Sequence, residues 1–408
     1  MRRRLFRLLQ HHSCEWQRGG SNRPNAKLGQ KSMKLKLHWK TQEHNLAGNA
    51  LGYNTHNSFM RKYSAPFFDF DDNAKMCLQI TPADQFSMVP DKYNVLFTMW
   101  EATEVPATYI RSLKCADLII VPSRFCKEIF RKHTDKPIEV CWEGIEPEHY
   151  PYHERRFPLL KYGEKFRFLW SGAPNPRKGT LSIAQVAKMI EKFPHMELYI
   201  KTTAQKYDHR AFITALWRTR KEVRKKIADG FMTSEHGVKA MLERSKIRKT
   251  GILDERVTRY GDNQNVIMDT RKLPIEDLAA LYNSAHCFLL PTLGEGWGLT
   301  LCEAMATGSP SIATAVTGCA DFFDDDVGYP IRYEIRDWYL DSYKVTAGIH
   351  APDTDDLAKQ MMHVYSHYGE ALRKGKRASD RIHNKFTWAK SGRRLYEIIK
   401  KYSGVANA

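Results

Sequence analysis

The sequence lacks long hydrophobic runs, cysteine clusters and internal repeats. Its longest apolar stretches, at 118–122, 287–291 and 312–316, are far shorter than the roughly 20 residues that a membrane-spanning helix needs. None of its eight cysteines forms a Cys-x-x-Cys pair or a cysteine–histidine group with zinc-site spacing. No period of roughly 20–50 residues recurs, which argues against a repeat protein. These absences leave an ordinary globular protein as the expectation.

The cysteines bear on the cell compartment. A chain of 408 residues is large enough to fold without disulfides, so we expect reduced thiols and a cytoplasmic location. The apolar run 5–9 is short and contains Arg7, which is not typical of a secretory signal. At roughly 100–200 residues per domain, the length indicates two or three domains.

Positive charge is plentiful but concentrated in two segments. The chain has 64 Lys and Arg against 46 Asp and Glu, a net charge of +18. Residues 1–32 contribute +7 and residues 205–250 contribute +8, so these segments hold 15 of the 18 charges. A polyanionic partner is the first interpretation. Nucleic acid is disfavoured, because the sequence contains no zinc finger, RNP-type motif or basic zipper.

We interpret residues 1–32 as a basic, disordered leader, because Met33 directly precedes the first alternating apolar run, 33–39. A targeting peptide and a polyanion-binding arm are the alternatives. Residues 205–250 form a long basic insertion with the pattern of charged helices. A solvated helical face or an element that contacts the acceptor or an anionic membrane would both fit.

From residue 33 onward, short apolar strands alternate with helices in two series. The first has strands at 33–39, 94–99, 116–122 and 137–141 and helices at 106–114 and 123–132. The second has strands at 166–171, 197–201, 266–268, 287–290 and 311–315 and helices at 182–192, 275–283 and 298–307. Apolar strands separated by helices indicate parallel sheets covered on both faces. The sequence therefore predicts an α/β fold with two facing doubly wound Rossmann-like domains, 33–160 and 161–385. The active site is expected in the cleft between them.

The strongest chemical signal is the stretch LLPTLGEGWGLTLCEAMATG at 289–308. An apolar strand leads into a loop with three glycines, Gly294, Gly296 and Gly298, and a helix begins near Leu299. The start of a helix offers unpaired N–H groups that suit a phosphate. Glu295 lies in the loop, and Glu303 lies about one turn into the helix with its side chain leaning toward the helix start. This pattern fits a nucleotide sugar, with its diphosphate at the helix start, its ribose on Glu303 and its sugar near Glu295.

In this setting the sequence resembles the retaining GT-B glycosyltransferases of family 4, also called group 1 glycosyltransferases. Their signature is two glutamates separated by seven residues, which Glu295 and Glu303 match. Further resemblances lie at 116–123, 141–146, 176–179 and 277–291. The resemblance covers most of 33–403. It implies a GT-B fold in which a closing segment, 386–408, crosses back to the first domain.

The resemblance also implies how the donor is bound. Glu303 would hold the nucleotide ribose, and Glu295 would contact the donor sugar. The backbone amides of Gly298, Leu299 and Thr300 would hold the distal phosphate.

Further donor contacts would come from outside this helix. Lys178 would pair with the diphosphate. The nucleobase would lie near Leu273, and Gly52, in the loop after the first strand, would face the phosphates. An arginine that many members carry before this lysine is absent here, so Arg177 and Lys201 are the candidate replacements.

The catalytic histidine of the family's first domain is not evident in this sequence. Glu101, in the matching region Met-Trp-Glu-Ala-Thr-Glu, is therefore the candidate that faces the reacting sugar; a structural hydrogen-bonding role is the alternative. The implied reaction moves a sugar from a nucleotide-diphosphate sugar to an acceptor hydroxyl with retention. It needs no metal and no cofactor, because the helix start and basic side chains stabilise the leaving diphosphate.

Several alternatives stay open. Paired carboxylates also serve glycoside hydrolases. A non-catalytic carbohydrate- or nucleic-acid-binding module of GT-B shape, or a nucleotide-sugar epimerase, would share the fold. The acceptor is left open among a glycan, a lipid-linked molecule and a small molecule, as is a peripheral contact with the inner face of an anionic membrane.

Overall fold

The computed structural model describes residues 34–41, 50–173, 175–202, 249–254, 256–260, 262–340 and 343–406. The predicted leader, 1–32, lies outside the described residues. So does the predicted insertion, 205–250, except for its last two residues, which begin a strand. After Lys34 the chain forms one compact unit.

The first sheet has six parallel strands in the order β2-β1-β3-β4-β5-β6. These are β1 (Leu35–Trp39), β2 (Phe68–Phe70), β3 (Met76–Ile80), β4 (Tyr93–Phe97), β5 (Leu118–Val121) and β6 (Ile138–Val140). Its helices are α1 (Ala50–Ser64), α2 (Ala107–Cys115) and α3 (Arg124–Arg131). Leu118 and Ile120 face one hydrophobic cluster and Ile119 and Val121 face another, because successive strand residues point to opposite sides. Both faces are thus covered, as the apolar runs predicted.

The second sheet has eight strands in the order β14-β13-β12-β7-β8-β11-β10-β9. These are β7 (Phe166–Ser171), β8 (Met196–Lys201), β9 (Lys249–Asp254), β10 (Val257–Tyr260), β11 (Val266–Asp269), β12 (Cys287–Leu290), β13 (Ser311–Ala313) and β14 (Tyr329–Pro330). The helices α4 (Thr180–Ile190), α8 (Ile275–Ser284) and α9 (Leu299–Ala306) follow β7, β11 and β12. The prediction of a purely parallel sheet is wrong at one edge, where β10 runs antiparallel to both neighbours. A short connection joins β9 to β10, and such a connection permits only antiparallel pairing.

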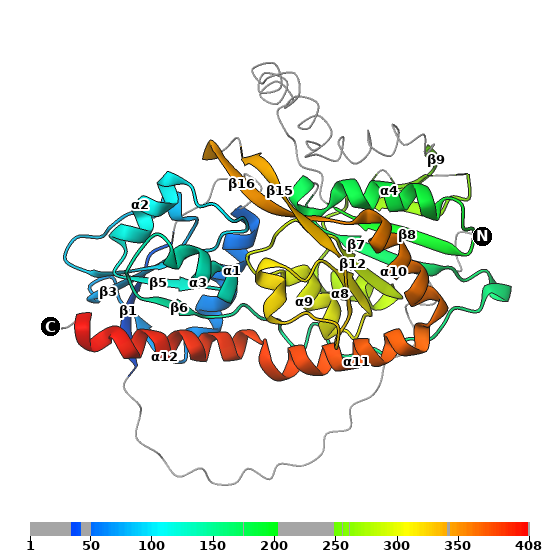
Figure 1. Cartoon of the computed structure of the whole chain (residues 1–408). Helices are drawn as coiled ribbons and strands as arrows, with labels where there is room; N and C mark the ends of the chain where they lie inside the picture. The colour runs from blue at the N-terminus through cyan, green and yellow to red at the C-terminus, as the bar shows by residue number, and fades with distance from the viewer. Residues whose placement is uncertain are drawn as a thin grey trace, which may run out of the picture. The chain divides into compact units, whose positions relative to one another are not determined.

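Two antiparallel strands, β15 (Tyr333–Leu340) and β16 (Val345–Pro352), form a separate ribbon that the sequence reading missed. Figure 1 shows this ribbon, in orange, extending from the second sheet toward α2. Ala347 and Ile349 of β16 are buried in the hydrophobic cluster that also holds Leu96 and Ile119 of the first sheet. The ribbon therefore packs on the first domain although it belongs in sequence to the second.

Three helices complete the chain: α10 (Thr354–Ser366), α11 (Tyr368–Lys385) and α12 (Trp388–Ala406). Helix α12 packs along α1 (Figure 1), and its Trp388, Leu395 and Ile399 join the core of the first sheet. The chain thus returns to the first domain at its end. The boundaries at 160 and 385 stay predictions. No helix in the described part of the chain has the length and apolarity needed to cross a membrane.

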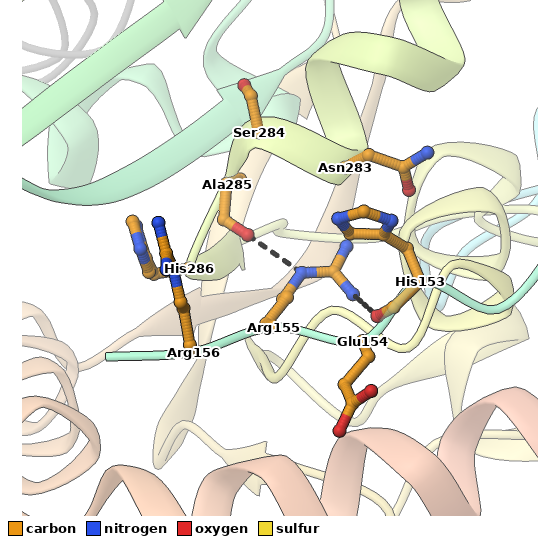
Figure 2. A pocket seen from close by; sticks show the side chains of 8 residues that line it. All are labelled: His153, Glu154, Arg155, Arg156, Asn283, Ser284, Ala285 and His286. Atoms are coloured by element: carbon orange, nitrogen blue, oxygen red, sulfur yellow. Dashed lines mark hydrogen bonds between the residues drawn. The ribbon is translucent and has the colours of Figure 1, made fainter. Parts of the chain in front are cut away.

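The segment between β6 and β7 is held against the second domain by the buried guanidinium of Arg155. It donates to the carbonyl oxygens of Ala285 at 2.8 Å, Thr307 at 2.6 Å and Tyr282 at 3.0 Å. A pocket of about 370 Å³ lies beside it, at the amino-terminal end of β12. Figure 2 shows the side chains that line this pocket. Ligands of open parallel sheets bind at the opposite end of the strands. This pocket therefore does not correspond to the predicted active site.

Candidate active site

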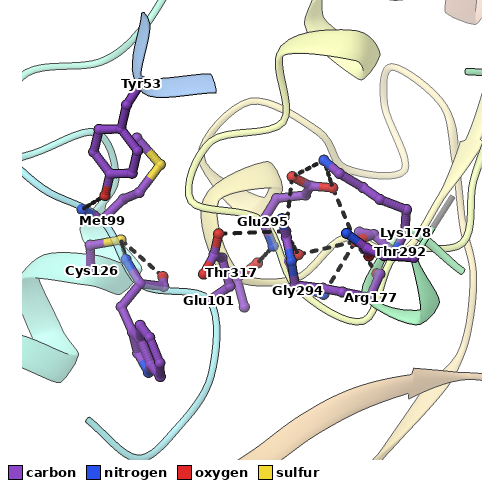
Figure 3. A network of polar contacts seen from close by, with 12 residues as sticks. Tyr53, Met99, Glu101, Cys126, Arg177, Lys178, Thr292, Gly294, Glu295 and Thr317 are labelled. Atoms are coloured by element: carbon purple, nitrogen blue, oxygen red, sulfur yellow. Dashed lines mark hydrogen bonds and ion pairs between the residues drawn. The ribbon is translucent and has the colours of Figure 1, made fainter. Parts of the chain in front are cut away.

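Charged and polar side chains from both sheets meet where the parallel strands end. Glu101 follows β4, Arg177 and Lys178 follow β7, Glu295 follows β12, and Thr317 follows β13. Figure 3 shows these side chains directed toward one another. The carboxyl ends of parallel strands carry the backbone and side-chain groups that bind ligands in such sheets. The structure thus brings together four predicted site residues, the two acids and the two bases.

Glu295 is the centre of this network. It is 4% exposed, and both of its carboxylate oxygens lie 2.7 Å from Nζ of Lys178. Burial alone would raise the pKa of Glu295, but the charges of Lys178 and Arg177 outweigh it and hold the pKa below its usual value. The hydroxyl of Thr292 also donates to Glu295, at 3.2 Å. Glu295 is therefore an ionised carboxylate whose position is fixed by its partners.

Arg177 connects the two domains. Its Nη1 lies 3.4 Å from the carboxylate of Glu295 and 3.5 Å from that of Glu101. The same nitrogen donates to the carbonyl oxygen of Gly294 at 2.7 Å. Burial would lower the pKa of Arg177, but the two carboxylates more than offset it and raise the pKa. Arg177 thus bridges an acid of the first domain and an acid of the second.

The loop glycines have a role that the sequence reading did not foresee. A methyl group at Gly294 would collide with the carbonyl oxygen of Glu101. A methyl group at Gly296 would lie 2.5 Å from Sδ of Met99. Their missing side chains therefore let the loop approach the protein's own first domain. Gly298 differs, because its φ of +110° is a conformation that favours glycine.

The start of α9 is open to an anion. Gly298 occupies the N-cap position without a side-chain cap. Within the described ranges, no group accepts a hydrogen bond from the amides of Leu299 and Thr300, and both residues are partly exposed. Unpaired amides at the positive end of a helix dipole bind phosphate well. The amides of Leu299 and Thr300, which the sequence predicted as phosphate ligands, are therefore available to bind an anion.

Glu303 has a different environment from Glu295. The hydroxyl of Tyr282 donates to its carboxylate at 2.9 Å, and Tyr150 adds a second hydrogen bond. Burial raises the pKa of Glu303 to about 7, although both tyrosine hydrogen bonds act to lower it. Near neutral pH the group is therefore present in both protonation states. The sequence reading did not single out either tyrosine, because each lies far from Glu303 in the chain and carries no local motif.

The remaining predicted residues lie outside the charged network. Lys201 is buried, and its ammonium donates to the carbonyl oxygens of Thr202 and Arg271. Burial lowers the pKa of Lys201. Leu273 is partly buried against the core of the second domain. Gly52 lies in the first turn of α1, so placing it in a loop was wrong; a glycine so near a helix start does not prevent the helix from forming.

A second polar contact between the domains was also missed. The carboxylate of Asp321 accepts from the backbone N–H of Arg124 at 3.1 Å and from the indole of Trp142 at 3.0 Å. Arg124 is the first residue of α3, so a carboxylate of the second domain caps a helix of the first. Only the position of Asp321 after β13 could have drawn attention to it.

Solved structures define the fold class. HepE of Anabaena, crystallised with UDP and glucose, superposes with a TM-score of 0.60 at 10% identity, covering 90% of this chain and all of that one. Sucrose-phosphate synthase of Thermosynechococcus elongatus gives a TM-score of 0.55 at 16% identity, covering 86% of this chain and 79% of that one. The chain has the GT-B fold of these proteins, as the sequence predicted.

The sequence comparisons show similarity to glycosyltransferases over part of the chain. Residues 245–367 match the family model described as "Glycosyl transferases group 1". D-inositol 3-phosphate glycosyltransferase of Corynebacterium kroppenstedtii is 28% identical over 129 residues, 31% of this chain and 24% of that protein. The chain thus matches about a quarter of the length of its curated relatives. The family resemblance seen in the sequence is confirmed.

Proposed function

We propose that the protein is a glycosyltransferase that moves a sugar from a nucleotide-diphosphate sugar to an acceptor hydroxyl with retention. The observation that carries this proposal is the ionised Glu295 held by Lys178 and Arg177 beside the open start of α9. The match of residues 245–367 to the group 1 family model supports it, as does the UDP and glucose bound to HepE.

In the proposed reaction the donor diphosphate lies at the amides of Leu299 and Thr300. Lys178 turns from Glu295 to the diphosphate, and no metal or other cofactor is part of the proposal, because these groups meet the charge of the leaving group. The bond between the anomeric carbon and the diphosphate oxygen breaks, and a bond to the acceptor oxygen forms on the same face. The acceptor proton passes to the departing phosphate oxygen. Glu295 holds the donor sugar, and Glu101 faces the reacting centre.

Glu303 is proposed to hold the ribose. A carboxylate fixed by two tyrosine hydroxyls keeps lone pairs free for the two ribose hydroxyls. Because the pKa of Glu303 is raised to about 7, we expect donor binding to weaken below neutral pH. Thermal shift with UDP, GDP, ADP and CDP tests this site, since binding to the native state alone raises stability. Glu303→Ala should abolish the shift, and Glu128→Ala, which removes an exposed glutamate of α3, should retain it.

Product analysis separates the alternatives. A transferase releases the nucleotide diphosphate faster when an acceptor is present. An epimerase converts the donor without releasing nucleotide, and a hydrolase cleaves a glycan without any nucleotide. A binding module does none of these. Nucleotide release that no acceptor accelerates, from a broad acceptor panel, would contradict the transferase proposal.

We also propose that the protein is cytoplasmic and touches an anionic membrane at the segment between β6 and β7. Phe157, Leu159, Leu160 and Tyr162 are each 39–69% exposed there. Arg156 lies beside them, and its guanidinium is largely exposed. Exposed apolar groups next to basic ones are typical of peripheral membrane contacts. Co-sedimentation with phosphatidylglycerol vesicles should fall for the Leu159→Ser/Leu160→Ser variant; binding that stays unchanged would refute this contact.

A further inference from the structure

The backbone of Glu295 is held on both sides by one short turn. Thr317 and Gly318 begin the 3₁₀ turn Thr317–Asp321, which follows β13. The hydroxyl of Thr317 accepts from the N–H of Glu295 at 2.8 Å. The N–H of Gly318 donates to the carbonyl oxygen of Glu295 at 2.9 Å. Figure 3 shows Thr317 beside Glu295 in the polar network. Both backbone groups of Glu295 therefore depend on two adjacent residues of another loop.

Thr317 adopts a backbone conformation that is unfavourable for its residue type. Its φ is +52°, and a β-branched residue in this left-handed region is strained. The residue is also buried, with 5% exposed. Glycine would adopt this conformation without strain. The side chain, and not the backbone, therefore accounts for a threonine at this position. The other non-glycine residues with positive φ in the described ranges are exposed: Asp91, Gln264 and Lys344.

The hydroxyl of Thr317 is oriented by a second hydrogen bond. It donates its proton to the carbonyl oxygen of Val316 at 2.8 Å, which leaves lone pairs of the oxygen for the N–H of Glu295. The two loops are also in close contact, because a methyl group at Gly318 would lie 2.2 Å from the carbonyl oxygen of Gly296. The place of the Glu295 backbone, and with it the direction of the carboxylate, thus depends on the Thr317 hydroxyl.

We propose that Thr317 is a positioning residue for recognition of the donor sugar. Its hydroxyl fixes the backbone of Glu295 so that the carboxylate faces the sugar of the bound donor. The inference rests on the proposed function for the contact between Glu295 and the sugar, whereas the hold of Thr317 on Glu295 does not. Loss of the hydroxyl should weaken binding of the sugar, but not of the nucleotide diphosphate at Lys178 and the start of α9.

Thermal shift with paired ligands, UDP against UDP-glucose and GDP against GDP-mannose, tests this on the full chain. Thr317→Val keeps the shape and the β-branched strain but removes the hydroxyl. We expect its apparent Kd for the sugar nucleotide to rise about tenfold, as for the loss of one hydrogen bond. Its shift with the nucleotide diphosphate should be at least that of the wild type. Thr317→Ser keeps the hydroxyl and should restore binding of the sugar nucleotide.

Two further variants separate positioning from folding. Thr317→Gly removes the strain together with the hydroxyl, so it should melt no lower than Thr317→Val and yet bind the sugar nucleotide as weakly. Thr134→Val is the matched control, because Thr134 is buried in the first domain and its hydroxyl accepts from the N–H of Lys136 at 3.2 Å. It should bind both ligands as the wild type does.

A double-mutant cycle tests the hold on Glu295 without any ligand. If Thr317 directs the carboxylate toward Lys178, removing that carboxylate matters less once the hydroxyl is gone. Glu295→Gln should therefore lower Tm by about 4 °C in the wild type but by only about 2 °C in Thr317→Val. If Thr317→Val does not fold, Thr317→Gly takes its place in both experiments.

The outcomes separate this proposal from the proposed function. Additive losses of Tm in the cycle overturn the positioning role, as does a Thr317→Gly variant that binds the sugar nucleotide like the wild type. If no nucleotide diphosphate or sugar nucleotide shifts the wild type, the donor-site proposal fails. The cycle still decides in that case whether Thr317 positions Glu295.

Discussion

Replacing Glu295 with glutamine should separate its structural role from its role in the reaction. The variant keeps the shape of the side chain but leaves Lys178 and Arg177 without their shared countercharge. Lys178 is 17% exposed and Glu295 6% exposed at the side chain, so water screens this pair little. Breaking a buried ion pair costs about 3–5 kcal/mol. We expect about 3 kcal/mol for Glu295→Gln, because Glu101 stays near Arg177 and compensates in part.

This loss should be measurable as a lower melting temperature. With an unfolding entropy of about 2.1 cal/mol/K per residue, a loss of about 3 kcal/mol lowers Tm by about 4 °C in a chain of this size. A nucleotide diphosphate should restore more stability to Glu295→Gln than to the wild type, because it supplies the missing negative charge to Lys178. Circular dichroism melts with and without the nucleotide measure both effects.

Glu101→Gln is the matched control for this experiment. Its carboxylate is 22% exposed and makes a single longer contact with Arg177, at 3.5 Å. Its loss should cost less than about 1 kcal/mol. A Glu295→Gln variant as stable as Glu101→Gln would refute the electrostatic reasoning. So would a nucleotide diphosphate that stabilises Glu295→Gln less than it stabilises the wild type.

Three further predictions concern the close packing around Glu303, Gly294 and Arg155. The pKa of Glu303 is raised to about 7 in the fold, so its stabilising contribution is present below its ordinary pKa and is lost as the pH rises through 7. In urea unfolding, Glu303→Gln should therefore be more stable than the wild type at pH 8 but not at pH 4. Parallel curves of stability against pH for the two proteins would contradict this. Gly294→Ala should destabilise the protein by about 1–3 kcal/mol through its clash with Glu101. Gly404→Ala in α12, where the added methyl group has no neighbour within 4 Å, should be neutral or stabilising. Equal melting temperatures of the two variants would refute the steric argument. Arg155→Ala should cost at least about 3 kcal/mol, because several buried carbonyl oxygens lose their donor, and a smaller loss in urea unfolding would show that water replaces the guanidinium.

The sequence was sufficient where the signal is local. The strand, glycine loop and helix of 289–308 follow one another directly in the chain, so their order predicted the start of α9 and both glutamates beside it. The cap of α3 is equally local, because the hydroxyl of Ser123 accepts from the N–H of Cys126, three residues further on. Apolar strands between helices predicted the fold class because burial on both faces leaves a continuous hydrophobic run.

The ribbon of β15 and β16 was missed because its two strands do not show the local apolar pattern of buried strands. Six of the eight residues of β15 are exposed, and the surface that buries β16 lies in the other domain. The antiparallel edge at β10 was missed because pairing direction depends on the connection, which no apolar pattern reveals. Gly52 was misplaced because glycine near a helix start is also typical of a loop.

By itself, the sequence determined which residue types stand at the ends of which strands, because strand and helix periodicity are properties of neighbouring residues. Only the tertiary structure decided which of them meet. Arg177 reaches Glu101, and Tyr150 and Tyr282 reach Glu303, because separate elements pack together. The charge state of each glutamate follows from those contacts. Cations beside Glu295 lower its pKa and keep it ionised, whereas Glu303 has only hydroxyl partners and its pKa is raised to about 7.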